Sequence, residues 1–198
     1  MNDPYVLVLY YSHHGATSQL AKLIGRGIES IDGIEARLRT VPEISAKSEK
    51  VESSVPDSGA IYCSYEDLKH CSGLALGSPT RFGNMAAAMK YFLDGTSSQW
   101  LSGDLVDKPA CVFTSSSTMH GGQESTLLSM MLPLLHHGMC LLGVPYTCDE
   151  LMSTQSGGTP YGVTHVAGVN NDRQISESES LLAKAMGKRL AKFAKERV

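Results

Sequence analysis

The fold is decided by residues 5–18, which read YVLVLYYSHHGATS. Tyr5–Tyr11 is a continuous run of apolar, β-branched and aromatic residues, a pattern typical of a strand buried on both faces of a parallel sheet. A short polar loop follows, and apolar residues at three- and four-residue steps from Leu20 to Ile31 predict an amphipathic helix that closes near Asp32-Gly33. A buried strand, a short loop and a helix in this order open a βαβ unit.

The same alternation continues along the chain. Further strands are expected at residues 34–40, 73–76, 109–113 and 139–144, and further helices at residues 65–70, 85–93, 123–137 and 176–198. The polar residues 42–58 and the Gly/Ser/Thr-rich residues 153–162 are expected to form surface excursions. Strands that alternate with helices predict an α/β fold with right-handed crossovers. We therefore expect a single domain over residues 1–198, with a five-stranded parallel sheet and helices on both faces.

The composition agrees with one globular domain. The 198 residues are 42% hydrophobic and 19% charged, which excludes a disordered chain. The longest apolar run, residues 5–11, is far below the roughly 20 residues that span a bilayer, and the first four residues lack the basic start of a secretory signal. We expect a cytoplasmic protein without a membrane span. The net charge of −3 argues against nucleic-acid binding.

The five cysteines form no C-x-x-C pair and no Cys/His cluster at zinc spacing, so no metal site is expected. An odd number of cysteines without a secretory signal suggests reduced thiols. A role as small buried hydrophobic side chains is favoured over a role as reactive nucleophiles.

Three polar loops follow three of the expected strands, at residues 12–17, 77–84 and 114–122. Carboxyl ends of parallel strands meet at one sheet edge, where ligands bind in open α/β sheets. The first loop leads into a helix N-terminus, whose free amides and dipole favour an anion. It lacks both GxxxxGK[ST] and G-x-G-x-x-G, so a single phosphomonoester is favoured over a nucleoside triphosphate. An ordinary helix cap by Thr17 or Ser18 is the alternative.

The other two loops differ from the first in chemistry. Two glycines and a proline predict that residues 77–84 are irregular, and Arg81 and Phe82 within them suit a planar heterocycle. The alternative is that Phe82 covers the sheet edge. The third loop has five consecutive hydroxyl residues, Thr114–Thr118, before His120-Gly121-Gly122. This composition is unsuited to a core, and a binding role is favoured over a plain linker.

Five motifs together resemble those of the WrbA-type NAD(P)H:quinone oxidoreductases, which are relatives of flavodoxin. They are, in chain order, SHHG at residues 12–15, GSPTRFGNM at 77–85, GGQE at 121–124, HHGM at 136–139 and GGTPYG at 157–162. The resemblance covers nearly the whole chain. It implies a flavodoxin-like three-layer fold, non-covalently bound FMN, and NAD(P)H and quinones as substrates. It also implies a homotetramer in which an adjacent subunit completes the cavity.

The resemblance places FMN against residues of all three loops. Ser12–Thr17 would surround the phosphate, Thr80–Phe82 would lie beside the ring, and Ser115–Gly121 would hold its pyrimidine side. The cofactor-binding residues that the resemblance implies are Ser12, His13, His14, Gly15, Ala16, Thr17, Pro79, Thr80, Arg81, Phe82, Gly83, Ser115, Ser116, Ser117, Thr118, Met119, Gly121 and His136. Trp100 matches the aromatic that lines the quinone and nicotinamide cavity. His14 stands where the family commonly carries a tyrosine linked to stacking on the nicotinamide.

The reaction implied by the resemblance is hydride transfer from NAD(P)H to the flavin and two-electron reduction of a quinone, with His136 assisting quinone protonation. From their positions alone, His136 and His137 are interpreted as helix caps. His13, His70 and His165 are expected at the surface. A one-electron flavodoxin-type carrier and an FMN-binding regulatory protein are the alternatives. No G-x-S-x-G motif supports a hydrolase.

Overall fold

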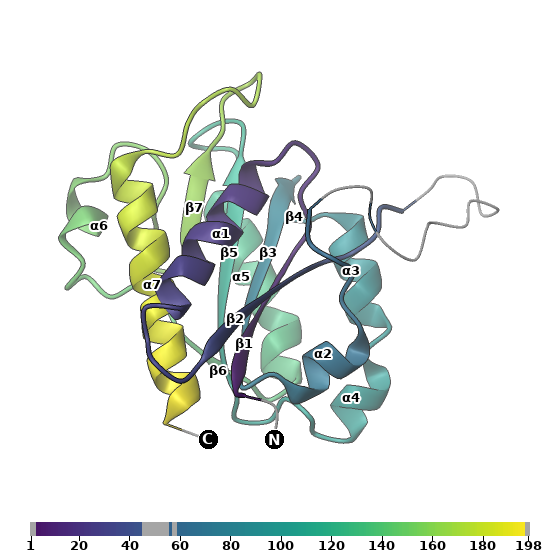
Figure 1. The fold of residues 1–198 in the computed structure, drawn as a ribbon. Helices are drawn as coiled ribbons and strands as arrows, with labels where there is room; N and C mark the ends of the chain where they lie inside the picture. The colour runs from purple at the N-terminus through teal and green to yellow at the C-terminus, as the bar shows by residue number, and fades with distance from the viewer. Residues whose placement is uncertain (1–2, 45–55, 57–58, 197–198) are drawn as a thin grey trace.

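The computed structural model describes residues 3–44, 56 and 59–196. Its centre is a parallel sheet with the strand order β2-β1-β3-β5-β6, to which β7 adds beside β5 and the short antiparallel β4 beside β3. The strands are β1 (Tyr5–Tyr10), β2 (Glu35–Thr40), β3 (Gly73–Arg81), β4 (Asn84–Met85), β5 (Pro109–Ser116), β6 (Cys140–Leu141) and β7 (Val163–Val166). The helices are α1 (Ala16–Ile28), α2 (Tyr65–His70), α3 (Ala87–Asp94), α4 (Ser97–Leu101), α5 (Gln123–His136), α6 (Asp149–Ser153) and α7 (Glu177–Lys195). Helices cover both faces of the sheet, which confirms the expected three-layer α/β arrangement (Figure 1).

Strand β1 divides the core between the two faces of the sheet. All six of its residues are buried, as the apolar run predicts. The even-numbered residues from Val6 to Tyr10 pack with α1 and α7, whereas the odd-numbered residues from Tyr5 to Leu9 pack with α2, α3 and α5. The strand order reverses between β1 and β3, the position at which sheets of this kind form a crevice. The first loop therefore emerges at the middle of the carboxyl edge.

Helices α1 and α7 are in direct backbone contact on one face of the sheet. A β-carbon built on Gly27 of α1 would lie 2.1 Å from the carbonyl oxygen of Lys184, and one built on Gly187 of α7 would lie 2.1 Å from the carbonyl oxygen of Ile24. Only a hydrogen atom fits at either position. The two glycines let α7 hold α1 closely against the sheet.

Replacing Gly27 by alanine is expected to lower the free energy of unfolding by about 1–3 kcal/mol, because a backbone carbonyl cannot yield to the added methyl group. Gly25→Ala on the same helix is the matched control, since its β-carbon would meet the tip of the Leu38 side chain at 3.2 Å. Urea unfolding at 25 °C compares the two variants. An equal decrease in the free energy of unfolding in Gly27→Ala and Gly25→Ala would contradict the close contact at Gly27.

The prediction that the second polar loop is irregular throughout is wrong. Strand β3 continues to Arg81, and only Phe82 and Gly83 form the turn of a hairpin to β4. Pro79 is tolerated in this strand because Gly77 is the last residue of β3 that pairs with β1. The missing N–H of the proline therefore lies beyond the end of the neighbouring strand.

The strand expected at residues 139–144 is only partly right. Strand β6 has two residues, which pair with the start of β5, and the end of β5 pairs instead with β7, which sequence analysis did not predict. Residues 142–162 leave the sheet between these two strands and carry α6. His165 lies on β7 and is 1% exposed, so its expected place at the surface is wrong. Smaller differences are that β5 reaches Ser116 and that α3 begins at Ala87.

Four cysteine side chains lie in the hydrophobic core or pack against it. Cys71 and Cys111 are buried, and burial raises the pKa of the Cys71 thiol to about 11 and that of Cys111 to about 12. Burial also raises the pKa of the half-buried Cys63 and Cys148. None of the four therefore ionises readily at neutral pH.

The polar excursion expected at residues 42–58 lies mostly outside the described residues. Across the part of the chain that the structure describes, no helix has both the length and the apolar character needed to cross a bilayer.

Candidate functional site

The three polar loops meet in one cavity of about 160 Å³ at the carboxyl edge of the sheet. The cavity is lined by Ser12, His13, His14, Ala16, Thr17, Pro79, Thr80, Arg81, Ser115, Ser116, Ser117 and Asn171. Six further residues of the predicted set lie in the same loops but outside this lining: Gly15, Phe82, Gly83, Thr118, Met119 and Gly121. Parallel pairing of β1, β3 and β5 brings the loops together, because it places all three carboxyl ends at one edge.

The N-terminus of α1 opens into the cavity. Gly15 precedes the helix in the left-handed conformation, with φ at 89°, which favours glycine. The N-cap residue of α1 is Gly15, so the alternative of a cap by Thr17 or Ser18 is wrong, and the side-chain contact to the first turn comes from Ser12, whose Oγ accepts from the Ser18 amide at 3.3 Å. The amides of Ala16 and Thr17 precede the first amide that bonds within the helix, which is that of Gln19 to the Gly15 carbonyl oxygen at 3.0 Å, and the first turn carries no acidic residue. These N–H groups are available to an anion.

Hydroxyl groups tie the loops to one another. Thr17 Oγ1 and Ser115 Oγ share a buried hydrogen bond of 2.8 Å, which joins the first loop to the end of β5. Thr80 Oγ1 and Thr126 Oγ1 share one of 2.6 Å, which joins the end of β3 to α5. The hydroxyl groups around the cavity are therefore held in place before any ligand arrives.

The charges around the cavity favour a negatively charged ligand group. None of the described residues that line it is acidic, and the lining includes the positively charged guanidinium of Arg81 and the imidazole donors of His13 and His14. His13 Nδ1 is 3.1 Å from Glu43 Oε1, which lies outside the lining. A volume of about 160 Å³ is below the roughly 300–1,000 Å³ of a whole small-molecule site. The cavity fits the polar end of a larger ligand.

Phe82 stands clear of the protein at the tip of the β3–β4 hairpin. Its relative exposure is 108%, so the alternative that it covers the sheet edge is wrong. Its φ of 51° is in the left-handed region, which is uncommon for an aromatic residue. A fully exposed ring on a constrained turn offers a flat surface to a partner.

His136 and Trp100 lie away from the cavity, although the resemblance implies a role for both at the flavin. Helix α5 starts beside the third loop, and its 14 residues carry His136 about 20 Å toward the opposite edge of the sheet. Trp100 Nε1 donates to the carbonyl oxygen of His136 at 2.8 Å, and both residues line a separate hollow of about 390 Å³. His137 is buried against Thr96, with its Nε2 2.9 Å from the Thr96 hydroxyl oxygen. Burial and the neighbouring His136 lower the pKa of His137.

Asn171 lines the cavity, and sequence analysis missed it. It belongs to the loop that follows β7, and that strand was not predicted. The available signal was the short run VTHV at residues 163–166, followed by Gly168 and two asparagines.

A family model described as NADPH-dependent FMN reductase matches residues 4–147, which is most of the chain. The chain belongs to this family. Two relatives of this family member are each named NAD(P)H dehydrogenase (quinone). The one from Geotalea daltonii is 42% identical over 196 residues and covers 96% of each chain. The one from Syntrophobacter fumaroxidans is 40% identical over 198 residues and covers 96% of this chain and 97% of its own. These matches confirm the resemblance drawn from the five motifs.

Solved structures confirm the flavodoxin-like fold of this FMN reductase family member. A flavodoxin, WrbA-like protein from Agrobacterium tumefaciens superposes with a TM-score of 0.71 at 21% identity, over 98% of this chain and 99% of its own. A flavodoxin from the domain Archaea superposes with a TM-score of 0.62 at 18% identity, over 96% of this chain and 99% of its own.

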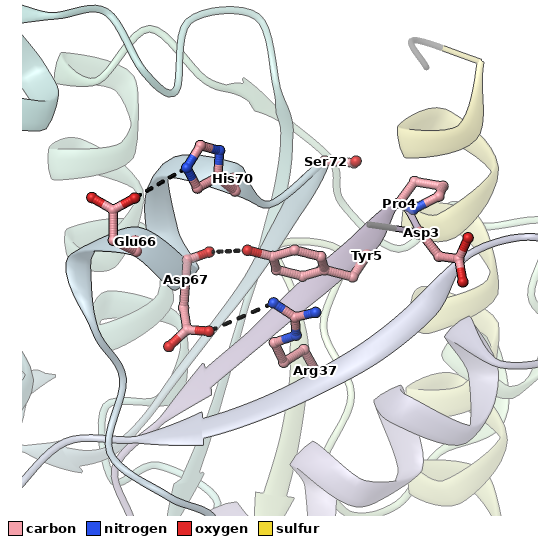
Figure 2. A pocket seen from close by; sticks show the side chains of 8 residues that line it. All are labelled: Asp3, Pro4, Tyr5, Arg37, Glu66, Asp67, His70 and Ser72. Carbon is pink, nitrogen blue, oxygen red and sulfur yellow. Dashed lines mark hydrogen bonds and ion pairs between the residues drawn. The ribbon is translucent and has the colours of Figure 1, made fainter. Parts of the chain in front are cut away.

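This FMN reductase family member has a further hollow of about 480 Å³ near the starts of β1 and β3, at the opposite edge of the sheet (Figure 2). The Arg37 guanidinium lies 3.5 Å from the centroid of the Tyr5 ring and 3.7 Å from an Asp67 carboxylate oxygen. The Tyr5 hydroxyl donates to the carbonyl oxygen of Asp67 at 2.8 Å, and His70 pairs with Glu66 at 3.0 Å. These groups satisfy one another, and we assign no ligand to this hollow.

Proposed function

We propose that this protein is an FMN-dependent NAD(P)H:quinone oxidoreductase that reduces quinones to hydroquinones by two electrons. The observation that carries the proposal is the three-loop cavity, whose lining, among the residues that the structure describes, offers hydrogen-bond donors and the Arg81 guanidinium and no carboxylate. The FMN reductase family and the names of the two relatives support the same activity. When bound, FMN supplies the chemistry that accepts a hydride from NAD(P)H and delivers two electrons to a quinone.

In this proposal the residues of the cavity fall into three groups, which hold the FMN phosphate, hold the flavin ring and contact the nicotinamide. The amides at the start of α1, Ser12 and Thr17 hold the FMN phosphate, because the free amides and the dipole of a helix N-terminus favour an anion. Thr80–Phe82 lie beside the ring, and Ser115–Gly121 hold its pyrimidine side. His14 contacts the nicotinamide. The protein positions the cofactor and its substrates, and no side chain is needed as a nucleophile.

We propose further that the working form is a homotetramer, in which sites lie at subunit interfaces. Trp100 and His136 are separated from the three-loop cavity of their own chain by about the length of α5. A second copy supplies them, so that Trp100 lines the quinone cavity and His136 assists protonation of the quinone. Exposed apolar side chains on α3–α5 offer an interface, namely Tyr91, Leu101, Leu128, Leu132 and Leu135.

A cytoplasmic location and the absence of a nucleic-acid partner stay predictions from the sequence. Five free cysteines in the described residues fit a reducing compartment.

The test is an anaerobic absorbance spectrum of the FMN-reconstituted protein, taken before and after addition of NADH or NADPH and again after benzoquinone. We expect the flavin band to bleach with the nicotinamide and to return with the quinone. FMN that binds but is reduced by neither nicotinamide would favour the one-electron carrier. Absence of FMN binding would overturn the three-loop site. Free FMN with the same additions is the blank.

A further inference from the structure

A fourth loop reaches the cavity from the carboxyl end of β7. Strand β7 runs parallel to β5, with His165 opposite Ser115, and the Ala167 amide donates to the carbonyl oxygen of Ser116 at 2.7 Å. The chain that follows, residues 167–175, therefore leaves the sheet at the same edge as the three polar loops (Figure 1). Within this loop, Asn171 lines the cavity.

The two ends of this loop are joined by one carboxylate. Glu179 Oε1 accepts from the Val166 amide at 3.2 Å, at the start of the loop, and Glu179 Oε2 accepts from the Ser176 amide at 2.8 Å, at its end. The same carboxylate accepts from His165 Nδ1 at 2.9 Å. Glu179 is fully buried. The base of the loop is thus fixed by hydrogen bonds to one buried carboxylate inside the protein.

The inside of the loop is also ordered by its own backbone. The Asn171 amide donates to the carbonyl oxygen of Gly168 at 3.1 Å, and the Arg173 amide donates to that of Ala167 at 3.0 Å. Asn171 has a φ of 55°, a left-handed conformation that asparagine tolerates better than most residues. The backbone of Asn171 is therefore set before a ligand binds.

We propose that Asn171 is a cofactor-binding residue whose side-chain amide donates to the phosphate end of FMN, and that Glu179 is the positioning residue that fixes its loop. This rests on the proposed function. Helix α1, whose N-terminus forms the anion-holding end of the cavity, packs against β7, so the loop arrives from that end. A side-chain amide supplies two donors and no charge. The neighbouring Asp172 and Arg173 carry opposite charges, and neither lines the cavity.

The experiment compares FMN with riboflavin, which has the same ring and lacks the phosphate. Flavin fluorescence titrations at fixed ionic strength measure both dissociation constants for the wild type, Asn171→Ala and Asn170→Ala. Asn170 is the matched control, because it is exposed in the same loop and does not line the cavity. We expect Asn171→Ala to weaken FMN binding about tenfold and to leave riboflavin binding unchanged, since a hydrogen bond to a charged group is lost. Asn170→Ala should change neither.

The role of Glu179 is tested by the conservative Glu179→Gln and by the double variant. We expect Glu179→Gln to reduce the preference for FMN over riboflavin, and Asn171→Ala to add little in the Glu179→Gln background, because both act through one contact. A simple loss of stability would not produce this non-additivity.

Four outcomes would overturn the proposal in whole or in part. One is that Asn171→Ala binds FMN as tightly as the wild type does, and another is that it loses riboflavin binding equally, which would mean that Asn171 does not contact the phosphate. Fully additive effects of the two substitutions would reject Glu179 as the positioning residue. A wild type that binds neither flavin overturns the proposed function itself and the role of Asn171 with it. If Glu179→Gln does not fold, the Asn171 comparison still decides.

Discussion

Replacing Glu179 by leucine is expected to lower the free energy of unfolding by about 3–5 kcal/mol, because five hydrogen-bond donors inside the protein lose their acceptor. Besides His165 and the two loop ends, the carboxylate accepts from the Ser156 hydroxyl and the Gly157 amide, each at 2.8 Å. Leucine keeps the volume and removes every acceptor. Urea unfolding at pH 7 measures the loss.

Glu177→Leu, in the exposed first turn of the same helix, is the matched control and should change stability by no more than about 0.5 kcal/mol. A similar decrease in the free energy of unfolding in both variants would show that the buried carboxylate of Glu179 contributes no more to stability than the exposed one of Glu177.

Glu179 is also expected to make the free energy of unfolding depend on pH in the acid range. Burial raises the pKa of Glu179, but the hydrogen bonds from His165, Ser176 and Ser156 outweigh it and lower the pKa from 4.5 to about 2. A carboxyl whose pKa is lower in the folded state stabilises the fold above pH 4.5, and its contribution disappears as the pH falls toward 2. At 1.36 kcal/mol for each pKa unit, the contribution is about 3 kcal/mol. The stability difference between wild type and Glu179→Leu should therefore shrink over this range.

Replacing Ser12 by aspartate is expected to weaken FMN binding by more than about 100-fold. The new carboxylate would stand at the anion-holding end of the cavity, where the wild type has no acidic group in the described lining. Two like charges about 4 Å apart near a protein surface repel by about 4 kcal/mol, and about 1.4 kcal/mol corresponds to a tenfold change. Flavin fluorescence titration gives the dissociation constants.

Ser12→Ala removes the hydroxyl without adding a charge, and it should weaken FMN binding by no more than about tenfold. Riboflavin binding should be affected far less than FMN binding by the aspartate. FMN binding by the aspartate variant as tight as by the alanine variant would mean that the phosphate lies elsewhere.

The elements that depend on local pattern were predictable from the sequence. The apolar run of β1 and the helical spacing of α1 need no distant partner to be recognised. Parallel pairing then places the carboxyl ends of β1, β3 and β5 at one edge, so most of the cavity lining also followed from the order of strands and loops.

The parts that depend on distant contacts were not predictable. Strand β7 has four residues, with Thr164 and His165 in the middle, and such a run is too short and too polar to be recognised as a strand without its partner β5. His165 is buried because Glu179, fourteen residues later, supplies a buried carboxylate for it. Missing β7 also meant missing the loop that carries Asn171. In the same way, Phe82 gives no local sign that its ring will stand fully exposed.

The protonated thiols have a consequence for the chemistry proposed here. Quinones are electrophiles that arylate sulfur, and the attacking species is the thiolate. Burial raises the pKa of Cys63, Cys71, Cys111 and Cys148, so each remains a poor nucleophile at neutral pH. An enzyme that repeatedly admits quinones is thereby protected from inactivation by its own substrates at these four positions.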